Sequence, residues 1–202
     1  MGVALLPTTA DAYILPSHHV TKRADAILAK RPQLQVAAQG RIWPEGSLSP
    51  LAIGERWIFG STTQVDINGP DGQKARWHSN GKEEGLVKLL PPRAMRFPLT
   101  QIFGSRRPSA LAKAIGVDES VQSLALARDR IALVIGAGPQ QLSRPQVWFD
   151  QETFQVLRIV LLADNAQYDL TLDDWGSPIT GNLFPGRILL RRNRRRRREI
   201  KI

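Results

Sequence analysis

Short stretches that alternate between apolar and polar residues run through most of the chain, and they restrict its fold more than any other feature. The stretch YDLTLD at residues 168–173 is typical, and similar stretches surround residues 34–38, 65–67, 75–77 and 131–135. Alternation predicts strands with one buried face, because successive side chains of a strand point to opposite sides. Turn residues separate the stretches, and the connections are too short for crossover helices. The pattern therefore predicts an antiparallel sheet.

Two segments follow the helical period instead. Between Val20 and Lys30 the apolar residues recur on one face of a helix. A second helix is predicted over Pro108–Ile115, where proline suits the first turn and Gly116 is placed to cap the end. We therefore predict an α+β fold in which a strongly curved antiparallel sheet, an incomplete β-barrel, wraps over about two short helices.

The chain is long enough for one well-buried core, because 42% of its 202 residues are hydrophobic. We expect one β-rich domain over residues 20–190, an N-terminal segment over 1–19 and an arginine-rich hairpin or tail over 191–202. The N-terminal segment contains an apolar stretch and then Ala10-Asp11-Ala12, the small-x-small pattern that signal peptidase accepts, without the basic start of a complete signal. It is either the remnant of a signal peptide, as in an exported protein, or an ordinary terminus.

Positive charge is concentrated at the C-terminal end. The formal net charge is +10, and the last twelve residues, RRNRRRRREIKI, hold seven Arg and one Lys against one Glu. Proteins that bind nucleic acid usually spread such residues over a face, which argues against nucleic acid as a partner. The flanking residues alternate, so we predict a last β-hairpin that turns at Asn193 and whose arginines protect a solvent-facing edge strand.

The alternative is that the arginine-rich end binds nucleic acid or an anionic membrane surface, since basic runs of this length are a signature of both. The candidate contacts for such a surface are Arg191, Arg192, Arg194, Arg195 and Arg196.

The candidate catalytic motifs lack the structural context that they need. Gly136-x-Gly138 follows a predicted strand, but Gln141 occupies the third glycine position of a dinucleotide-binding turn, and no helix has room to follow. Asp173 and Asp174 are neighbours that should face opposite ways in a strand. We interpret the glycines as a loop and the carboxylates as unrelated to catalysis.

Metal binding lacks a signature as well. The chain has no cysteine, and His18, His19 and His78 do not have the spacing of metal ligands on a helix. We therefore expect a protein that is not an enzyme and has no cofactor and no metal.

Large aromatic residues lie on or beside the predicted strands. Such rings usually form the core, but a strongly curved sheet can turn some of them toward a cavity for an apolar ligand. The candidates for such a cavity are Trp43, Trp57, Phe59, Trp77, Trp148 and Phe154.

Three segments resemble LolA-like proteins, the periplasmic carriers of lipoproteins and their relatives. They are ERWIFGSTTQVDINGPDGQKARWHSNGK at 55–82, PQVWFDQETFQVLRIVL at 145–161 and YDLTLDDWGSPITGNLFPGRILL at 168–190. The resemblance implies an incomplete barrel whose apolar cavity takes lipid or lipoprotein acyl chains. It also implies a non-catalytic, monomeric carrier in the periplasm that works with an inner- or outer-membrane complex.

One departure from the family pattern limits what the resemblance implies. Carriers of this family show W-V-K-R-P, with an arginine that bears on lipoprotein handling, where this chain reads Trp57-Ile58-Phe59-Gly60-Ser61. Binding of a lipid or another amphiphile is therefore the expectation, rather than lipoprotein transfer in particular. A structural component of the envelope without a ligand would share the same fold.

Overall fold

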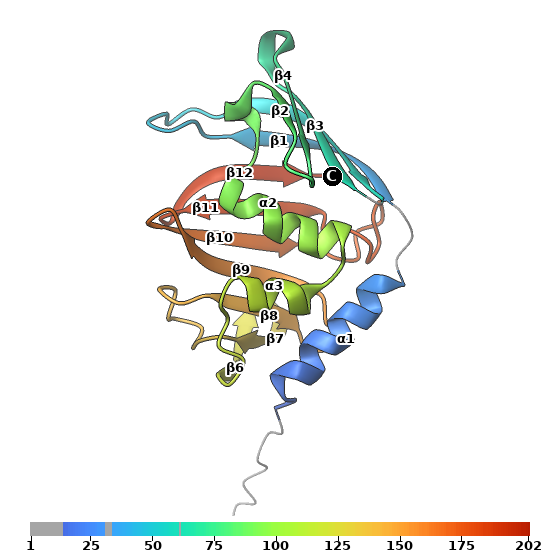
Figure 1. Cartoon of the computed structure of the whole chain (residues 1–202), viewed down its shortest axis with the longest axis vertical. Coiled ribbons are helices and arrows are strands. Elements are labelled where there is room, and N and C mark those ends of the chain that lie inside the picture. Colours follow the sequence, from blue (N-terminus) through green and yellow to red (C-terminus); the bar gives the residue numbers. More distant parts are fainter. Residues whose placement is uncertain (1–13, 31–33, 61) are drawn as a thin grey trace, which may run out of the picture.

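A computed structural model describes residues 14–30, 34–60 and 62–202, and these residues form one antiparallel sheet of twelve strands with three α-helices on one face (Figure 1). The helices are α1 (Ser17–Ala29), α2 (Arg93–Leu99) and α3 (Pro108–Ala114). The strands are β1 (Leu34–Ile42), β2 (Leu51–Phe59), β3 (Thr63–Asn68), β4 (Lys74–His78), β5 (Glu83–Gly85), β6 (Gln122–Ala127), β7 (Arg130–Ile135), β8 (Gln146–Asp150), β9 (Val156–Ala163), β10 (Ala166–Asp173), β11 (Arg187–Arg192) and β12 (Arg195–Lys201).

The strand order is β5-β4-β3-β2-β1-β12-β11-β10-β9-β8-β7-β6. Strands β1 to β5 form one half of the sheet and β6 to β12 the other, and the first and last strands of the chain join the halves. The sheet stays open because β5 and β6 lie at its opposite ends. These features confirm the predicted α+β fold with a curved, incomplete antiparallel barrel.

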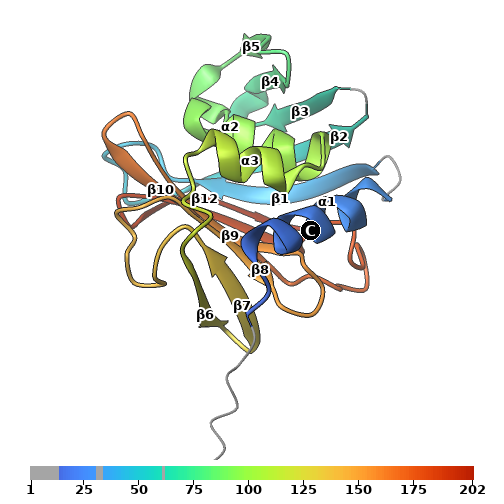
Figure 2. The ribbon, with the colours of Figure 1, turned by 60° about the horizontal axis from the view of Figure 1, so that its bottom comes forward.

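All three helices lie across the same face of the sheet, which curves around them (Figures 1 and 2). We call this the inner face; it carries Trp57, Leu170 and Leu190. Helix α1 begins at Ser17, three residues earlier than predicted, and α3 ends before Gly116, whose positive φ of 72° confirms the predicted cap. Asp25 of α1 accepts hydrogen bonds from the backbone N–H and the hydroxyl of Ser109, and so ties α1 to the first turn of α3.

Helix α2 was not predicted from the sequence. It is only seven residues long, contains Pro98, and continues into a π-helical turn over Thr100–Gly104. A proline normally argues against a helix because it lacks an N–H donor and crowds the preceding turn. Here Pro98 lies near the end of the helix, and the wider π-helical turn continues the segment beyond it.

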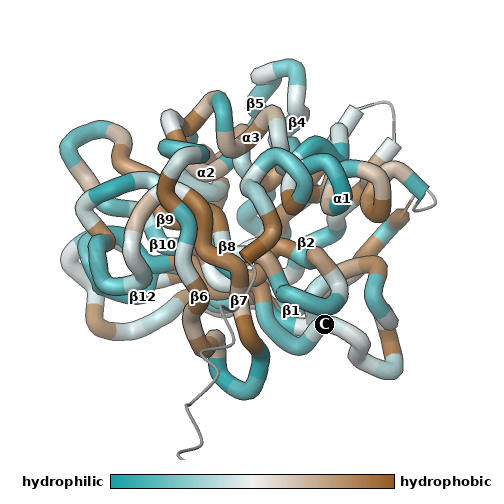
Figure 3. The backbone as a smooth tube through the Cα atoms, turned by 90° about the horizontal axis from the view of Figure 1, so that it is seen from below, coloured by the Kyte–Doolittle hydropathy of each residue, from teal (hydrophilic) through white to brown (hydrophobic). Residues whose placement is uncertain are grey.

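The core lies between the helices and the inner face. Trp57, Phe59, Phe103 and Phe184 form one aromatic cluster, with ring centroids 4.6 to 6.3 Å apart. Seen from below in Figure 3, many of the hydrophobic stretches lie toward the middle of the molecule and many of the peripheral turns are hydrophilic. One core therefore serves both halves of the sheet.

The arginine-rich end forms the predicted hairpin. Asn193 and Arg194 connect β11 to β12 with φ values of 50° and 65°, the two positive values that a type I′ turn requires. The prediction of an edge strand was wrong, because β12 pairs with β1 on its other side, from Gln39↔Lys201 to Ile42↔Arg198. This pairing joins the first and last strands of the sheet in chain order. Local alternation does not reveal which strands become neighbours.

Within the described ranges, no helix has the length and hydropathy needed to cross a membrane. The Ala10-Asp11-Ala12 pattern lies outside the described residues.

Candidate functional site

A pocket of about 270 Å³ opens between the inner face and the segment that leads into α2. Its lining includes residues next to the turns of the β1–β2 and β11–β12 hairpins. Both hairpins turn on the left in Figure 1. Its lining consists of apolar side chains with charged ones among them: Ile42, Trp43, Pro44, Glu45, Leu51, Lys88, Leu90, Pro92, Tyr168, Leu190, Arg192, Arg197 and Arg198. We call this the mouth pocket.

The mouth pocket borders a smaller cavity of about 10 Å³ beneath α2, with which it shares Leu190 and Arg198. Met95 and Leu99 of α2 lie on one side of this cavity, and Trp57 and Leu170 lie on the sheet side. The inner cavity is therefore almost filled by side chains, and its lining is apolar except for Arg198. A ligand that entered from the mouth would meet apolar surface as soon as α2 moved away from the sheet.

One buried cation holds the start of α2. The Arg96 side chain is 9% exposed; its Nε donates to the carbonyl of Pro91 at 2.8 Å, and its guanidinium pairs with Glu83. Arg93 Nε also lies 3.3 Å from Glu83 Oε1. The residues of α2 that line the inner cavity, Met95 and Leu99, are apolar. Apolar contacts do not depend on a fixed direction. The helix can therefore move relative to the sheet without breaking directional hydrogen bonds at these residues.

Four cations and one carboxylate line the mouth pocket. The Glu45 Oε1 atom lies 3.5 Å from Arg192 Nη1 and 3.8 Å from Arg197 Nη2, and the Glu45 side chain is 80% exposed. The Nε atoms of Arg192, Arg197 and Arg198 are buried and have no hydrogen-bond partner among the described residues. The pocket thus holds more positive charge, and more N–H donors, than its own acceptors satisfy.

A β-bulge brings two adjacent arginines to the same pocket. Leu190 pairs with Arg198 and Arg191 with Arg196, so Arg197 is an extra residue in β12. Adjacent strand residues normally point to opposite faces, but a bulge redirects side chains locally. Arg197 and Arg198 therefore both line the mouth pocket.

Arg198 also forms a buried ion pair with Glu55 of β2. Arg198 Nη2 lies 2.5 Å from Glu55 Oε1, and Arg198 Nη1 donates to the carbonyl of Leu89 at 2.8 Å. The other carboxylate oxygen of Glu55 accepts from the indole N–H of Trp57 at 2.8 Å. This pair was not predicted from the sequence, although Glu55 follows the same alternation as the buried Ile53 and Trp57, and an inward carboxylate needs a partner.

The predicted apolar residues lie at different places in the fold. Trp43 lines the mouth pocket, and Trp57 lines the inner cavity. Phe59 and Trp77 are buried in the core, as is Phe154, whose ring carries the guanidinium of Arg23 at 4.7 Å. Trp148 lies in a different hollow, where Arg158 covers its ring at 4.9 Å. Of the six, Trp43 and Trp57 therefore line the two adjoining cavities, and Phe59 contacts Trp57 within the aromatic cluster without lining either cavity.

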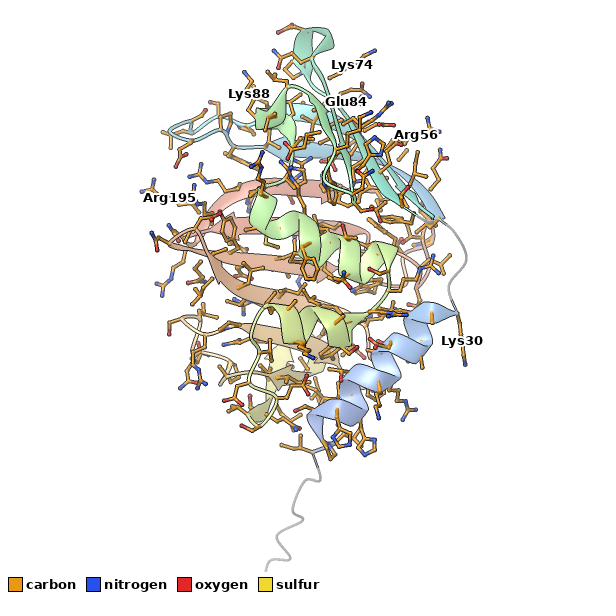
Figure 4. All side chains as sticks on the ribbon, in the orientation of Figure 1. Lys30, Arg56, Lys74, Glu84, Lys88 and Arg195 are labelled. Atoms are coloured by element: carbon orange, nitrogen blue, oxygen red, sulfur yellow. The ribbon has the colours of Figure 1, made fainter. Side chains whose placement is uncertain are left out.

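The predicted arginines also separate. Arg192 lines the mouth pocket, and Arg196 lies over the ring of Trp43 at 5.4 Å from the ring centroid. Arg194 and Arg195 are exposed at the turn, and Figure 4 shows Arg195 at the edge of the molecule. Arg191 lines the hollow that contains Trp148. Lys88, Arg197 and Arg198 were not predicted from the sequence. Arg197 and Arg198 reach the pocket through the bulge in β12, and Lys88 through the turn over Val87–Leu89 that precedes α2.

That second hollow, of about 690 Å³, is larger but its charged groups largely neutralise one another. Arg130 pairs with Asp150 at 3.1 Å and Arg158 with Asp169 at 2.8 Å. Among the described residues that line it, none also lines the inner cavity, whereas the mouth pocket shares Leu190 and Arg198 with that cavity. We therefore take the mouth pocket and the inner cavity as the candidate site.

The expectation that Asp173 and Asp174 face apart was wrong. Arg128 Nη2 lies 2.6 Å from Asp173 and its Nη1 lies 3.4 Å from Asp174, so one guanidinium binds both carboxylates. Strand β10 ends at Asp173, and Asp174 has a φ of 58°, so alternation no longer applies. Burial raises the pKa of Asp173 against the opposing effect of Arg128.

The remaining motifs have structural positions. Gly136 and Gly138 lie in the loop between β7 and β8, as predicted. His18 and His19 are neighbours in α1 with ring centroids 4.1 Å apart, and His78 ends β4. In the part of the chain that the structure describes, no three His, Asp or Glu side chains gather in a way that could hold a metal ion.

No family model matches the sequence, and no curated protein matches it either. Among solved structures, a LolA superfamily protein from Nitrosomonas europaea aligns with 93% of this chain and 91% of its own, at 12% identity and a TM-score of 0.48. A putative outer membrane lipoprotein-sorting protein domain from Vibrio parahaemolyticus aligns with 92% of this chain and 90% of its own, at 8% identity and a TM-score of 0.46.

A DUF1329 family protein from Desulfovibrio piger aligns over 92% of this chain and 90% of its own, with 11% identity and a TM-score of 0.38. Identities and TM-scores this low leave the ligand to be argued from the geometry of this chain. Each of the three alignments covers more than nine-tenths of this chain.

Proposed function

We propose that this protein binds the acyl chain of a lipid or another amphiphile between α2 and the inner face of the sheet, without catalysing a reaction. We further propose that it acts in the periplasm as a monomer that receives or delivers its ligand at a membrane complex. The single observation that supports the proposal is that the mouth pocket adjoins the apolar space beneath α2, with Leu190 and Arg198 lining both.

The volumes indicate what binding would require. The mouth pocket, at about 270 Å³, lies just below the ~300 to 1,000 Å³ range of typical ligand pockets. The inner cavity adds only about 10 Å³, so a long acyl chain needs α2 to move away from the sheet. Burying the chain would offset that movement, since each square ångström of apolar surface removed from water contributes about 25 cal/mol.

Binding can be tested on protein purified without detergent. We expect native mass spectrometry to show a bound lipid, or the delipidated protein to bind a fluorescent fatty acid in competition with unlabelled amphiphile. Protein that carries no lipid and binds no acyl probe would contradict the proposed function.

A matched pair of substitutions locates the ligand. Leu51 lines the mouth pocket at the start of β2, and Leu48, which is 97% exposed, lies outside the pocket in the same hairpin. Leu51→Trp should narrow the mouth and weaken probe binding by about tenfold, a free-energy change of ~1.4 kcal/mol. Leu48→Trp adds the same ring and should leave binding unchanged. Equal effects of both changes would place the probe elsewhere.

A second candidate function is docking on an anionic membrane surface. Arg194 and Arg195 are exposed in the β11–β12 turn, and Leu48 is exposed in the β1–β2 hairpin. The two hairpins turn at the same end of the sheet (Figure 1), and both contribute residues to the lining of the mouth pocket. Basic side chains near an anionic bilayer each contribute about 1 kcal/mol, and an exposed apolar tip can enter the headgroup region. This arrangement favours a membrane over nucleic acid, because the entrance of the pocket would then face the lipid.

Vesicle sedimentation tests the docking surface. We expect binding to phosphatidylglycerol vesicles that weakens as salt is raised, with little binding to phosphatidylcholine vesicles. The double change Arg194→Gln and Arg195→Gln should reduce the binding, whereas Lys30→Gln should not, because Lys30 directly follows α1, away from this end (Figure 4). Binding that ignores the turn arginines would contradict this function.

A further inference from the structure

We infer that the mouth pocket is a subsite for the anionic head group of the amphiphile, with Arg192 and Arg197 as its ligating side chains and Arg198 as the buried cation behind them. The chemical class is an amphiphile with one acyl chain and a phosphate or carboxylate at its polar end. The inference rests on the proposed function, because the acyl chain would occupy the space beneath α2.

The charge balance of the pocket supports an anionic ligand. Arg192, Arg197, Arg198 and Lys88 line it together with a single carboxylate, Glu45. The carboxylate of Glu55 is already engaged by Arg198 and Trp57 within the core. Phosphate and carboxylate groups match the planar guanidinium better than any neutral group does, because charge-assisted hydrogen bonds are roughly twice as strong as neutral ones.

The unsatisfied donors support the same ligand. The Arg198 side chain is only 5% exposed, and its Nε is buried. Neither this Nε nor those of Arg192 and Arg197 has a hydrogen-bond partner among the described residues. A buried donor without a partner costs free energy, and native structures usually provide an acceptor. An oxyanion in the mouth pocket would let the guanidinium groups turn toward such an acceptor.

Glu45 already shows where an anion lies in this pocket. Its carboxylate is shared between Arg192 and Arg197 at 3.5 and 3.8 Å, longer than the ~2.7 to 2.9 Å of a strong charged hydrogen bond. The side chain is 80% exposed on a hairpin loop, so releasing it to water costs little. The Glu45 carboxylate thus occupies the position of the head group, and it is displaced when the ligand binds.

The surroundings of the arginines orient the ligand. The guanidinium of Arg192 lies over the ring of Tyr168 at 5.9 Å, and Leu190 and Leu90 continue the lining toward the inner cavity. A head group held at Arg192 and Arg197 therefore leaves its acyl chain facing apolar side chains. The pocket accepts an amphiphile in one orientation only.

A matched pair of ligands tests the inference: lysophosphatidic acid and the monoacylglycerol with the same acyl chain, which lacks only the phosphate. Isothermal titration with delipidated full-length protein, below micelle-forming concentrations, should show about tenfold tighter binding of the phosphate monoester, and high salt should reduce this preference. Inorganic phosphate, as a third ligand, separates a head group from a free anion and should bind far more weakly than lysophosphatidic acid.

The variants are chosen so that charge alone does not explain the result. Arg192→Gln and Arg197→Gln should each lower the preference for the phosphate monoester by about three- to tenfold and leave monoacylglycerol binding unchanged. Arg194→Gln and Arg195→Gln remove the same charge from the exposed turn and should leave the preference intact. Glu45→Gln should raise the preference, because it removes the competing carboxylate.

Each outcome decides a different claim. If neither lipid binds, the proposed function fails. If both lipids bind equally, or the turn variants act like the pocket variants, the acyl site stands and the head-group subsite is overturned. If inorganic phosphate binds as tightly as lysophosphatidic acid, the pocket is a free-anion site, and its role as a head-group subsite is likewise overturned.

Discussion

Arg198 of β12 lies against Glu55 of β2, with Nη2 and Oε1 2.5 Å apart, although β1 runs between their strands. The pair crosses the junction between the two halves of the sheet on its inner face, and both side chains are almost fully buried. The charge density of the C-terminal end is therefore partly structural: one of its arginines neutralises a carboxylate inside the core.

This pair predicts a specific pattern of stability. Glu55→Gln or Arg198→Met alone should lower the free energy of unfolding by about 3 to 5 kcal/mol, because each leaves a buried charge without its partner. Glu55→Leu combined with Arg198→Met should recover most of that loss, since apolar groups can replace a buried ion pair. Urea denaturation measures all three; single changes that cost less than ~1 kcal/mol would show that the pair is not buried as described.

Asp150 predicts a dependence of stability on pH. Burial acts to raise the pKa of this carboxyl, but hydrogen bonds from Thr153, Arg130 and Glu152 outweigh it and lower the pKa below its ordinary value of 3.8. The N–H of Thr153 donates to Asp150 Oδ1 at 2.7 Å, and Arg130 lies 3.1 Å from Oδ2. Because the pKa of Asp150 is lower in the folded state, ionised Asp150 stabilises the fold at any pH above its pKa in the unfolded state. This contribution is lost as the pH falls through its pKa in the folded state.

We therefore expect Asp150→Asn to lower the free energy of unfolding at neutral pH by about 1 to 3 kcal/mol. The difference from the wild type should shrink as the pH falls below 3.8 and through the lowered pKa of the native carboxyl, which then becomes protonated. Denaturation curves over this pH range measure the difference, and a difference that did not change with pH would contradict the assignment.

Gly136 should tolerate no side chain, whereas Gly138 in the same loop should. Gly136 has a φ of 112°, and a Cβ atom there would lie 2.3 Å from the carbonyl oxygen of Pro145. At Gly138 the nearest atom to an added Cβ is Gln141 Oε1 at 3.5 Å, an ordinary contact. Gly136→Ala should lower the free energy of unfolding by about 2 kcal/mol or more, whereas Gly138→Ala should change it by less than ~0.5 kcal/mol. The thermal midpoints of the two variants compare them directly, and similar midpoints would contradict the loop geometry.

Asp25 should stabilise α3 from outside that helix. Its carboxylate accepts from the backbone N–H of Ser109 at 3.0 Å and from the Ser109 hydroxyl. Asp25→Ala should lower the free energy of unfolding by about 1 to 2 kcal/mol and speed hydrogen exchange in α3, because the first turn loses its acceptor. Lys22→Ala, on the exposed face of α1, is the control and should change neither quantity.

Local sequence patterns predicted the features of this fold that depend on a single strand or a single turn. The alternation at 168–173, the capping Gly116 and the turn at Asn193 each have a short-range cause, namely the period of a strand or the backbone conformation of one residue. Helix α2 escaped prediction because Pro98 and a length of seven residues hide its period. The resemblance to LolA-like proteins added the expectation of an apolar space beneath the helices.

The sequence by itself determined several of the strands, that the strands run antiparallel, and that the arginine-rich end turns back as a hairpin. Only the tertiary structure decided that β12 lies between β1 and β11, and that a bulge turns Arg197 and Arg198 into one pocket with Trp43. The physical reason is range: side-chain alternation and turn geometry act over a few residues. Strand order and the partner of a buried charge depend instead on contacts between residues far apart in the chain.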